Sequence, residues 1–235
     1  MRRMVAAQTA MELRLTLRRG ESLLLTLAIP LGLLAFLGTV DVVDVTVGFL
    51  VPGVLALAVM STAMTGLAIA TGFERQYGVL KRLGATPLSR PRLLAAKTLS
   101  VLAVEALQVA LLVALGVGLG WRPARGGLAA VPLVALGTAA FAGLGLLMAG
   151  TLRAEATLAA ANGLYLVLLL VSGMVLPLDR LPSGLAAVAR ALPSGALAEG
   201  LRHAFTGGAL LRPSLVLAAW AVAALAAASS TFRWE

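Results

Sequence analysis

Apolar runs about as long as a membrane is thick make up most of this sequence. The longest extends from about Phe49 to Gly72, and several others have a similar length. An α-helix needs about 20 mostly apolar residues to cross the ~30 Å hydrocarbon core of a bilayer. The repeated runs therefore predict an all-α protein that crosses a membrane several times.

The composition indicates that the whole chain belongs to the membrane. Of its 235 residues, 60% are hydrophobic and 12% are charged, whereas roughly a quarter of the residues in a soluble domain are charged. We therefore expect residues 1–235 to form a single transmembrane domain. Because the sequence contains no cysteine, it excludes disulfides, thiolate zinc sites and thiol nucleophiles.

Polar interruptions divide the chain into six expected spans and three other segments. Residues 1–21 mix arginines with apolar residues, which favours an amphipathic helix in the membrane interface over a disordered basic tail. Residues 177–213 carry too many charges for a lipid-facing helix, and Leu-Pro-Ser-Gly occurs there twice. Since this pattern suits helix starts and breaks, we expect two short helices folded over or partly into the bundle on the outer side. The expected spans are about 22–38, 49–72, 98–120, 127–150, 156–176 and 214–232, with a polar loop at 73–97.

The basic residues predict the orientation of these spans. A net charge of +9 would suggest nucleic acid as the partner of a soluble chain. With the N-terminus inside, 13 of the 19 lysines and arginines lie on the cytoplasmic side, where membrane proteins accumulate them. We therefore expect cytoplasmic termini, a cytoplasmic loop 73–97 and no binding of nucleic acid.

Within that loop, the order of charges predicts a short helix. Glu74 would lie in its first turn and Lys81 and Arg82 in its last, the arrangement that a helix dipole favours. Gly84 stands where a left-handed cap would end the helix. We expect one helix that begins near Glu74 and ends at Gly84.

The spacing of apolar residues supports an amphipathic helix at this point. Tyr77, Leu80 and Leu83 recur every three residues and are expected on one face. Gly78 lowers helix propensity by about 1 kcal/mol relative to alanine, which indicates a bend or a close backbone contact. Pro91 is expected in the first turn of the helix that becomes the third span.

This loop resembles the cytoplasmic loop of ABC exporter permeases of the type 2 superfamily, which includes bacterial multidrug and antibiotic exporters. Six spans and a short-helix element before the last span also match that family. Two departures are Gln76, where a second acid is common, and Val79, where threonine is common. The matching residues are Glu74-Arg75, Gly78, Leu80 with Leu83, Thr86-Pro87-Leu88 and Leu93-Leu94-Ala95-Ala96-Lys97.

The resemblance implies that the loop contains a coupling helix, which docks on a separate ABC ATPase subunit present in two copies. This chain has no Gly-Lys dipeptide for a phosphate-binding loop, so ATP and Mg²⁺ would be bound by the ATPase subunit. The chain itself is not expected to be an enzyme or to bind a cofactor. A second permease chain would complete a homodimer or heterodimer. The expected coupling residues are Glu74, Arg75, Gln76, Tyr77, Gly78, Leu80, Lys81, Arg82, Leu83, Gly84, Thr86 and Pro87.

Two residues of the third span form a second candidate site. Glu105 is the one carboxylate well inside a span, and Gln108 lies one turn further on the same face. Intramembrane acids are functional candidates by default. The alternative, which we favour, is a carboxylate near the inner interface, paired with an arginine of the N-terminal segment.

The expected function is export of an amphipathic or hydrophobic substrate, such as a drug, an antibiotic or a lipid, across the plasma membrane of a bacterium. One alternative is a membrane scaffold or anchor that transports nothing. A remote alternative is an intramembrane hydrolase that uses Ser194 and His203, although no nucleophile-elbow motif surrounds the serine.

Overall fold

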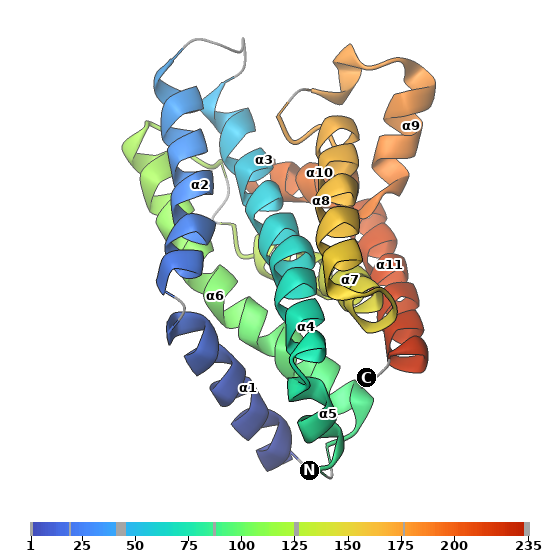
Figure 1. Ribbon diagram of the computed structural model, residues 1–235. Coiled ribbons are helices and arrows are strands. Elements are labelled where there is room, and N and C mark those ends of the chain that lie inside the picture. The colour runs from blue at the N-terminus through green and yellow to red at the C-terminus, as the bar shows by residue number, and fades with distance from the viewer. Residues whose placement is uncertain are drawn as a thin grey trace.

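The computed structural model describes residues 2–18, 20–40, 46–86, 88–124, 127–175 and 177–232. All regular secondary structure in these ranges is helical, as the sequence predicts. The elements form a bundle of long helices with shorter helices at its ends (Figure 1). In chain order they are α1 (Arg2–Arg18), α2 (Gly20–Thr39), α3 (Val47–Met60), the π-helical turn η1 (Ser61–Gly66), α4 (Leu67–Gln76), α5 (Val79–Gly84), α6 (Arg90–Gly118), α7 (Ala130–Thr151), α8 (Ala154–Val171), the 3₁₀ turn η2 (Leu178–Arg180), α9 (Ser183–Ala191), α10 (Pro193–Thr206) and α11 (Leu211–Thr231).

Within the described ranges, five helices are long and apolar enough to cross a membrane. They coincide with the expected spans from the second to the sixth, and the first of them runs without a break through α3, η1 and α4. The first expected span falls on α2, whose apolar part, Thr26–Thr39, is shorter than each of these five helices. The protein is therefore an integral membrane protein with several apolar helices, and a sixth crossing by α2 stays a prediction. The five helices are Val47–Gln76, Arg90–Gly118, Ala130–Thr151, Ala154–Val171 and Leu211–Thr231.

The core of the bundle lies around α3 and α7. All residues of α3 from Leu50 to Met60 are buried. On α7, a methyl group added at Gly143 would lie 2.7 Å from the Cβ of Ala224, and one added at Gly145 would lie 2.6 Å from the carbonyl oxygen of Met64. Small residues at these two positions thus let α11 and η1 approach the backbone of α7, which is how membrane helices gain packing contacts.

The segment 177–213 forms two short helices, α9 and α10, which start near the two copies of Pro-Ser. The helix α10 crosses the bundle, and α9 lies at the end opposite α5 (Figure 1). On α10, Arg202 donates hydrogen bonds of 2.6 and 3.2 Å to the carbonyls of Gly173 and Met174. Its guanidinium also stacks 3.7 Å from the ring centroid of Phe49. Burial lowers the pKa of Arg202 to about 10, so it stays charged at neutral pH and anchors α10 to α3 and to the end of α8.

Candidate functional site

The loop between α4 and α6 differs from the single helix predicted for it. The helix α4 ends at Gln76, and Gly78 adopts a left-handed conformation with φ of 69° before α5 begins at Val79. Glu74 therefore lies in the last turn of the long helix and not in the first turn of a short one. The prediction of a left-handed cap at Gly84 is also wrong, since Gly84 is the last residue of α5 and has no positive φ.

The side chains of α5 also differ from the predicted face. Leu80 is fully buried, whereas Tyr77 is 71% exposed, so Tyr77, Leu80 and Leu83 do not form one packed face. The ring of Tyr77 stacks on Phe73, with centroids 6.2 Å apart. The bend at Gly78 causes this difference, because it turns Tyr77 away from the face on which Leu80 packs.

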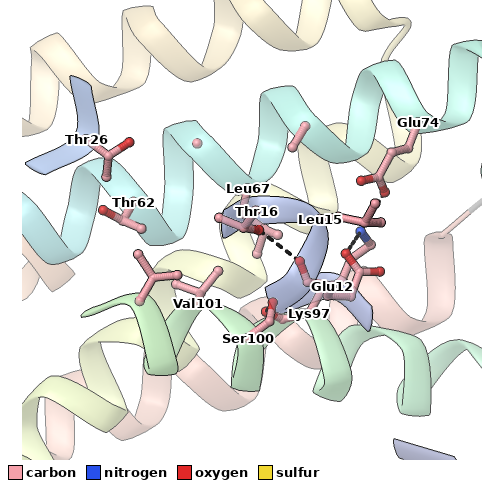
Figure 2. A pocket seen from close by; sticks show the side chains of 13 residues that line it. Glu12, Leu15, Thr16, Thr26, Thr62, Leu67, Glu74, Lys97, Ser100 and Val101 are labelled. Atoms are coloured by element: carbon pink, nitrogen blue, oxygen red, sulfur yellow. Dashed lines mark hydrogen bonds and ion pairs between the residues drawn. The ribbon is translucent and has the colours of Figure 1, made fainter. Parts of the chain in front are cut away.

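Pro91 lies in the first turn of α6, as predicted. Lys97 lies about two turns further along the same helix. Its side chain is 1% exposed. Its Nζ lies 3.0 Å from Oε2 of Glu12 on α1 and 2.6 Å from Oε2 of Glu74 on α4. Figure 2 shows the three side chains meeting from three helices. Lys97 therefore joins the N-terminal helix α1, the end of α4 and the start of α6.

Burial makes these ion pairs strong structural constraints. The two carboxylate side chains are only 10% and 12% exposed, and Nε2 of Gln8 donates a 2.9 Å hydrogen bond to the second oxygen of Glu12. A buried charge without a partner costs several kcal/mol. Each of the three helices is consequently held to the other two as long as the charges stay buried.

A cavity of about 100 Å³ lies beside the ion pairs. Its hydroxyl groups are already engaged, since Thr16 donates to the carbonyl of Glu12, Ser100 to that of Lys97 and Thr62 to the Gln108 side chain. Pockets for drug-sized molecules measure about 300–1,000 Å³. The cavity is therefore too small for such a substrate.

The end of α4 also contacts the turn between α7 and α8. Arg75 donates a hydrogen bond to the carbonyl of Leu152. Gln76 donates one of 2.9 Å to Oε1 of Glu155. The departure from the family pattern at Gln76 thus has a structural reason. An acid at this position would repel the carboxylate of Glu155, whereas the amide donates a hydrogen bond to it.

The other predicted coupling residues split between the interior and the surface. Leu80 is buried and Leu83 is half-buried, and Thr86 donates a 2.6 Å hydrogen bond to the carbonyl of Leu83 that closes the turn after α5. Pro87 lies outside the described residues. The exposed residues are Tyr77, Lys81, Arg82, Gly84 and Thr86. The loop therefore has an inner face fixed to the bundle and an exposed face with basic side chains.

Glu105 and Gln108 are both buried, but they face different neighbours. Thr138 of α7 donates a hydrogen bond to Oε2 of Glu105, while Oε1 has no partner among the described residues. Gln108 bonds instead to the carbonyl of Thr26 and to Thr62. The expected pairing of Glu105 with an arginine of the N-terminal segment is wrong, because Oε2 of Glu105 accepts from Thr138 and its buried Oε1 bonds to no described side chain.

The geometry gives no support to a hydrolase. Ser194 and His203 lie on the same helix, nine residues apart, which at 1.5 Å per residue separates them by about 13 Å. Nδ1 of His203 lies 2.7 Å from the carbonyl of Ala209, and the buried Oγ of Ser194 has no partner in the described ranges. In those ranges no three His, Asp or Glu side chains are placed to hold a metal ion.

Two charged side chains that connect helices in the structure were not predicted from the sequence. Glu12 could have been found as an acid among arginines, four residues after Gln8, with which it shares a helix face. Arg202 gave no such signal, because it is one of four arginines in the polar segment 177–213. Lys97 was noted as part of the motif, but not as a buried charge.

Comparison with known proteins identifies the family of the chain. The family model described as ABC-2 type transporter matches residues 5–206, which include α5, all three residues of the buried ion pairs, and α10. A search of curated proteins found no match. The chain belongs to the ABC-2 type transporter family and is a membrane permease of ABC-type transport.

Proposed function

We propose that this permease is the membrane-spanning subunit of an exporter driven by a separate ABC ATPase. Two ATPase subunits would bind ATP and Mg²⁺, and two permease chains, as a homodimer or a heterodimer, would form the substrate path. The substrate would be an amphipathic or hydrophobic molecule, since the spans are mostly apolar. The membrane would be a bacterial plasma membrane, crossed six times, with both termini in the cytoplasm.

The observation that carries the proposal is the connection between α5 and the buried ion pairs. Tyr77 and Arg82 are exposed on the loop, while Leu80 anchors α5 to the bundle. Three residues before Tyr77, Glu74 is bound to Lys97. A displacement of α5 would therefore reach α4 directly and would reach α6 and α1 through Lys97 and Glu12.

This connection gives a mechanism for opening the path. The α3–η1–α4 helix is continuous from Val47 to Gln76, so a force applied at its end would be transmitted along α4 as far as η1. The π-helical turn η1 lies in its middle, where Thr62 bonds to Gln108 of α6. Such turns often occur at functional sites in helices, and this one is the place where we expect the helix to bend during transport.

Charge reversal on the exposed face of the loop tests the proposal. We expect the double variant Tyr77→Ala/Arg82→Glu to lose most co-purification with a co-expressed ABC ATPase and to lower transport at least about tenfold. Its thermal unfolding in detergent should change little, because surface substitutions usually alter stability by less than about 0.5 kcal/mol. Transport into inverted vesicles and pull-down of the ATPase are the measurements.

Arg122→Glu is the matched control, since Arg122 is exposed in the turn after α6, at the far end of that helix from α5. It should leave both measurements unchanged. Normal ATPase binding and transport in the double variant would contradict the coupling role of the loop. ATPase binding without any ATP-dependent transport of amphipathic dyes would instead indicate a scaffold.

A further inference from the structure

A groove between α6 and α11 is separate from the ion pairs and from the exposed face of the loop. It measures about 490 Å³ and is lined by one face of α6, from Pro91 to Leu99, and by Leu225, Ala226 and Ser229 of α11. The helix α11 packs mainly along α7, which leaves this side of it open toward the lipid.

The surface of this groove is hydrocarbon. Thr98 donates a 2.9 Å hydrogen bond to the carbonyl of Leu94, and Ser229 donates one of 2.9 Å to the carbonyl of Ala226. Both hydroxyl groups thus donate their hydrogen bonds within their own helices and not into the groove. From Pro91 to Leu99 the lined face of α6 is about 12 Å long, a shape that suits an extended acyl chain.

Two arginines stand at the end of the groove. Arg90 and Arg92 flank Pro91, the first residue of the lined face, and neither lines the groove itself. At 100° per residue, they project about 100° to either side of Pro91. Neither side chain makes an ion pair or a hydrogen bond with another described residue. Both lie in the first turn of α6, which contains no acid and where the helix dipole favours an anion. The mouth of the groove therefore lacks a negative charge.

The described acids near this end of the bundle already have partners within the chain. Near this end of the bundle, Glu12 and Glu74 are bound to Lys97, and Glu155 accepts a hydrogen bond from Gln76. A phosphate group attached to a hydrocarbon chain supplies both an anion for the arginines and an occupant for the apolar groove.

We propose that this groove binds one phospholipid with an anionic headgroup. An acyl chain would lie between α6 and α11, and the headgroup phosphate would contact Arg90 and Arg92. The proposal requires only that α6 and α11 lie in a bilayer, and it is independent of any ATPase partner.

Native mass spectrometry of the full chain in detergent tests the proposal, with dioleoyl phosphatidylglycerol and dioleoyl phosphatidylcholine as probes. We expect phosphatidylglycerol to bind on the order of tenfold more tightly, because each basic residue near a membrane surface favours anionic lipid. The variant Arg90→Gln/Arg92→Gln should bind both lipids equally.

The apolar half of the site has its own matched pair of variants. Ala226→Phe fills the groove and should remove the bound phosphatidylglycerol. Ala219→Phe places the same ring on an exposed position of α11, two turns away on the same face, and should bind lipid as the parent does. Equal binding of the two lipids by the parent, or an equal effect of the two phenylalanines, would overturn the proposal. So would loss of self-association, with lipid binding intact, in Ala226→Phe, since a second copy would then be the occupant.

Discussion

Lys97 is the residue at which three distant segments of the chain meet. A lysine has three donors on its Nζ, and here two of them are directed at Glu12 and Glu74, 85 and 23 residues away in the sequence. The favourable interaction with two carboxylates offsets the cost of burying the ammonium group. Without the lysine, two partly buried carboxylates would face each other without a counter-charge.

Removal of this charge should destabilise the protein strongly. We expect Lys97→Met to lower the free energy of unfolding by about 3–5 kcal/mol, the usual cost of breaking a buried ion pair. The triple variant Lys97→Met/Glu12→Gln/Glu74→Gln should recover part of this loss, because it leaves no charge unpaired. Thermal unfolding in detergent is the measurement.

Lys81→Met is the control, since Lys81 is exposed on α5 and surface ion pairs contribute about 0–1 kcal/mol. If Lys97→Met unfolds at the same temperature as Lys81→Met, the buried ion pairs do not hold the three helices together.

At the scale of elements, the two copies of Leu-Pro-Ser-Gly show how packing gives identical sequences different roles. In α9, a methyl group added at Gly184 would meet no atom within 4 Å. In α10, one added at Gly195 would lie 2.0 Å from the carbonyl oxygen of Ala189. The second copy therefore needs its glycine for the close contact between α9 and α10, whereas the first does not.

Alanine substitution at the two positions should separate these roles. We expect Gly195→Ala to destabilise the protein by about 1–3 kcal/mol, because the backbone of α9 must move. Gly184→Ala should have no effect or should stabilise slightly, since alanine is the better helix former. Unfolding temperatures of the two variants give the comparison, and equal values would contradict the contact.

At the scale of the whole molecule, the two ends of the bundle carry different groups. The helices α1 and α5 and the end of α11 lie together at one end, and α9 lies at the other (Figure 1). The excess of basic residues in the segments near α1 and α5 predicts that this end faces the cytoplasm. The number of crossings then depends on α2.

Single cysteine substitutions can test this topology without background labelling, because the chain has no native cysteine. We expect a membrane-impermeant maleimide to label Arg14→Cys and Ala85→Cys only from the cytoplasmic side, and Val40→Cys and Arg122→Cys only from the outside. All four positions are exposed. Labelling of Val40→Cys from the same side as Arg14→Cys would show that α2 does not cross, and the cysteine-free parent serves as the control.

The sequence by itself determined the membrane character of the chain, five of its long helices and the position of the polar loop. These features follow from the length and hydropathy of continuous segments, which are local properties. Pro91 at the start of α6 was predictable for the same reason, since proline acts on its own turn.

Only the tertiary structure decided which polar residues meet. A spacing rule could not foresee that Gly78 would bend the loop, because the same glycine is compatible with a helix and with a left-handed turn. Nor could it pair Lys97 with Glu12, or Glu105 with Thr138, since these contacts join segments far apart in the chain. In the low dielectric of a membrane bundle, each buried charge takes the partner that helix packing places beside it, and packing is a property of the whole fold.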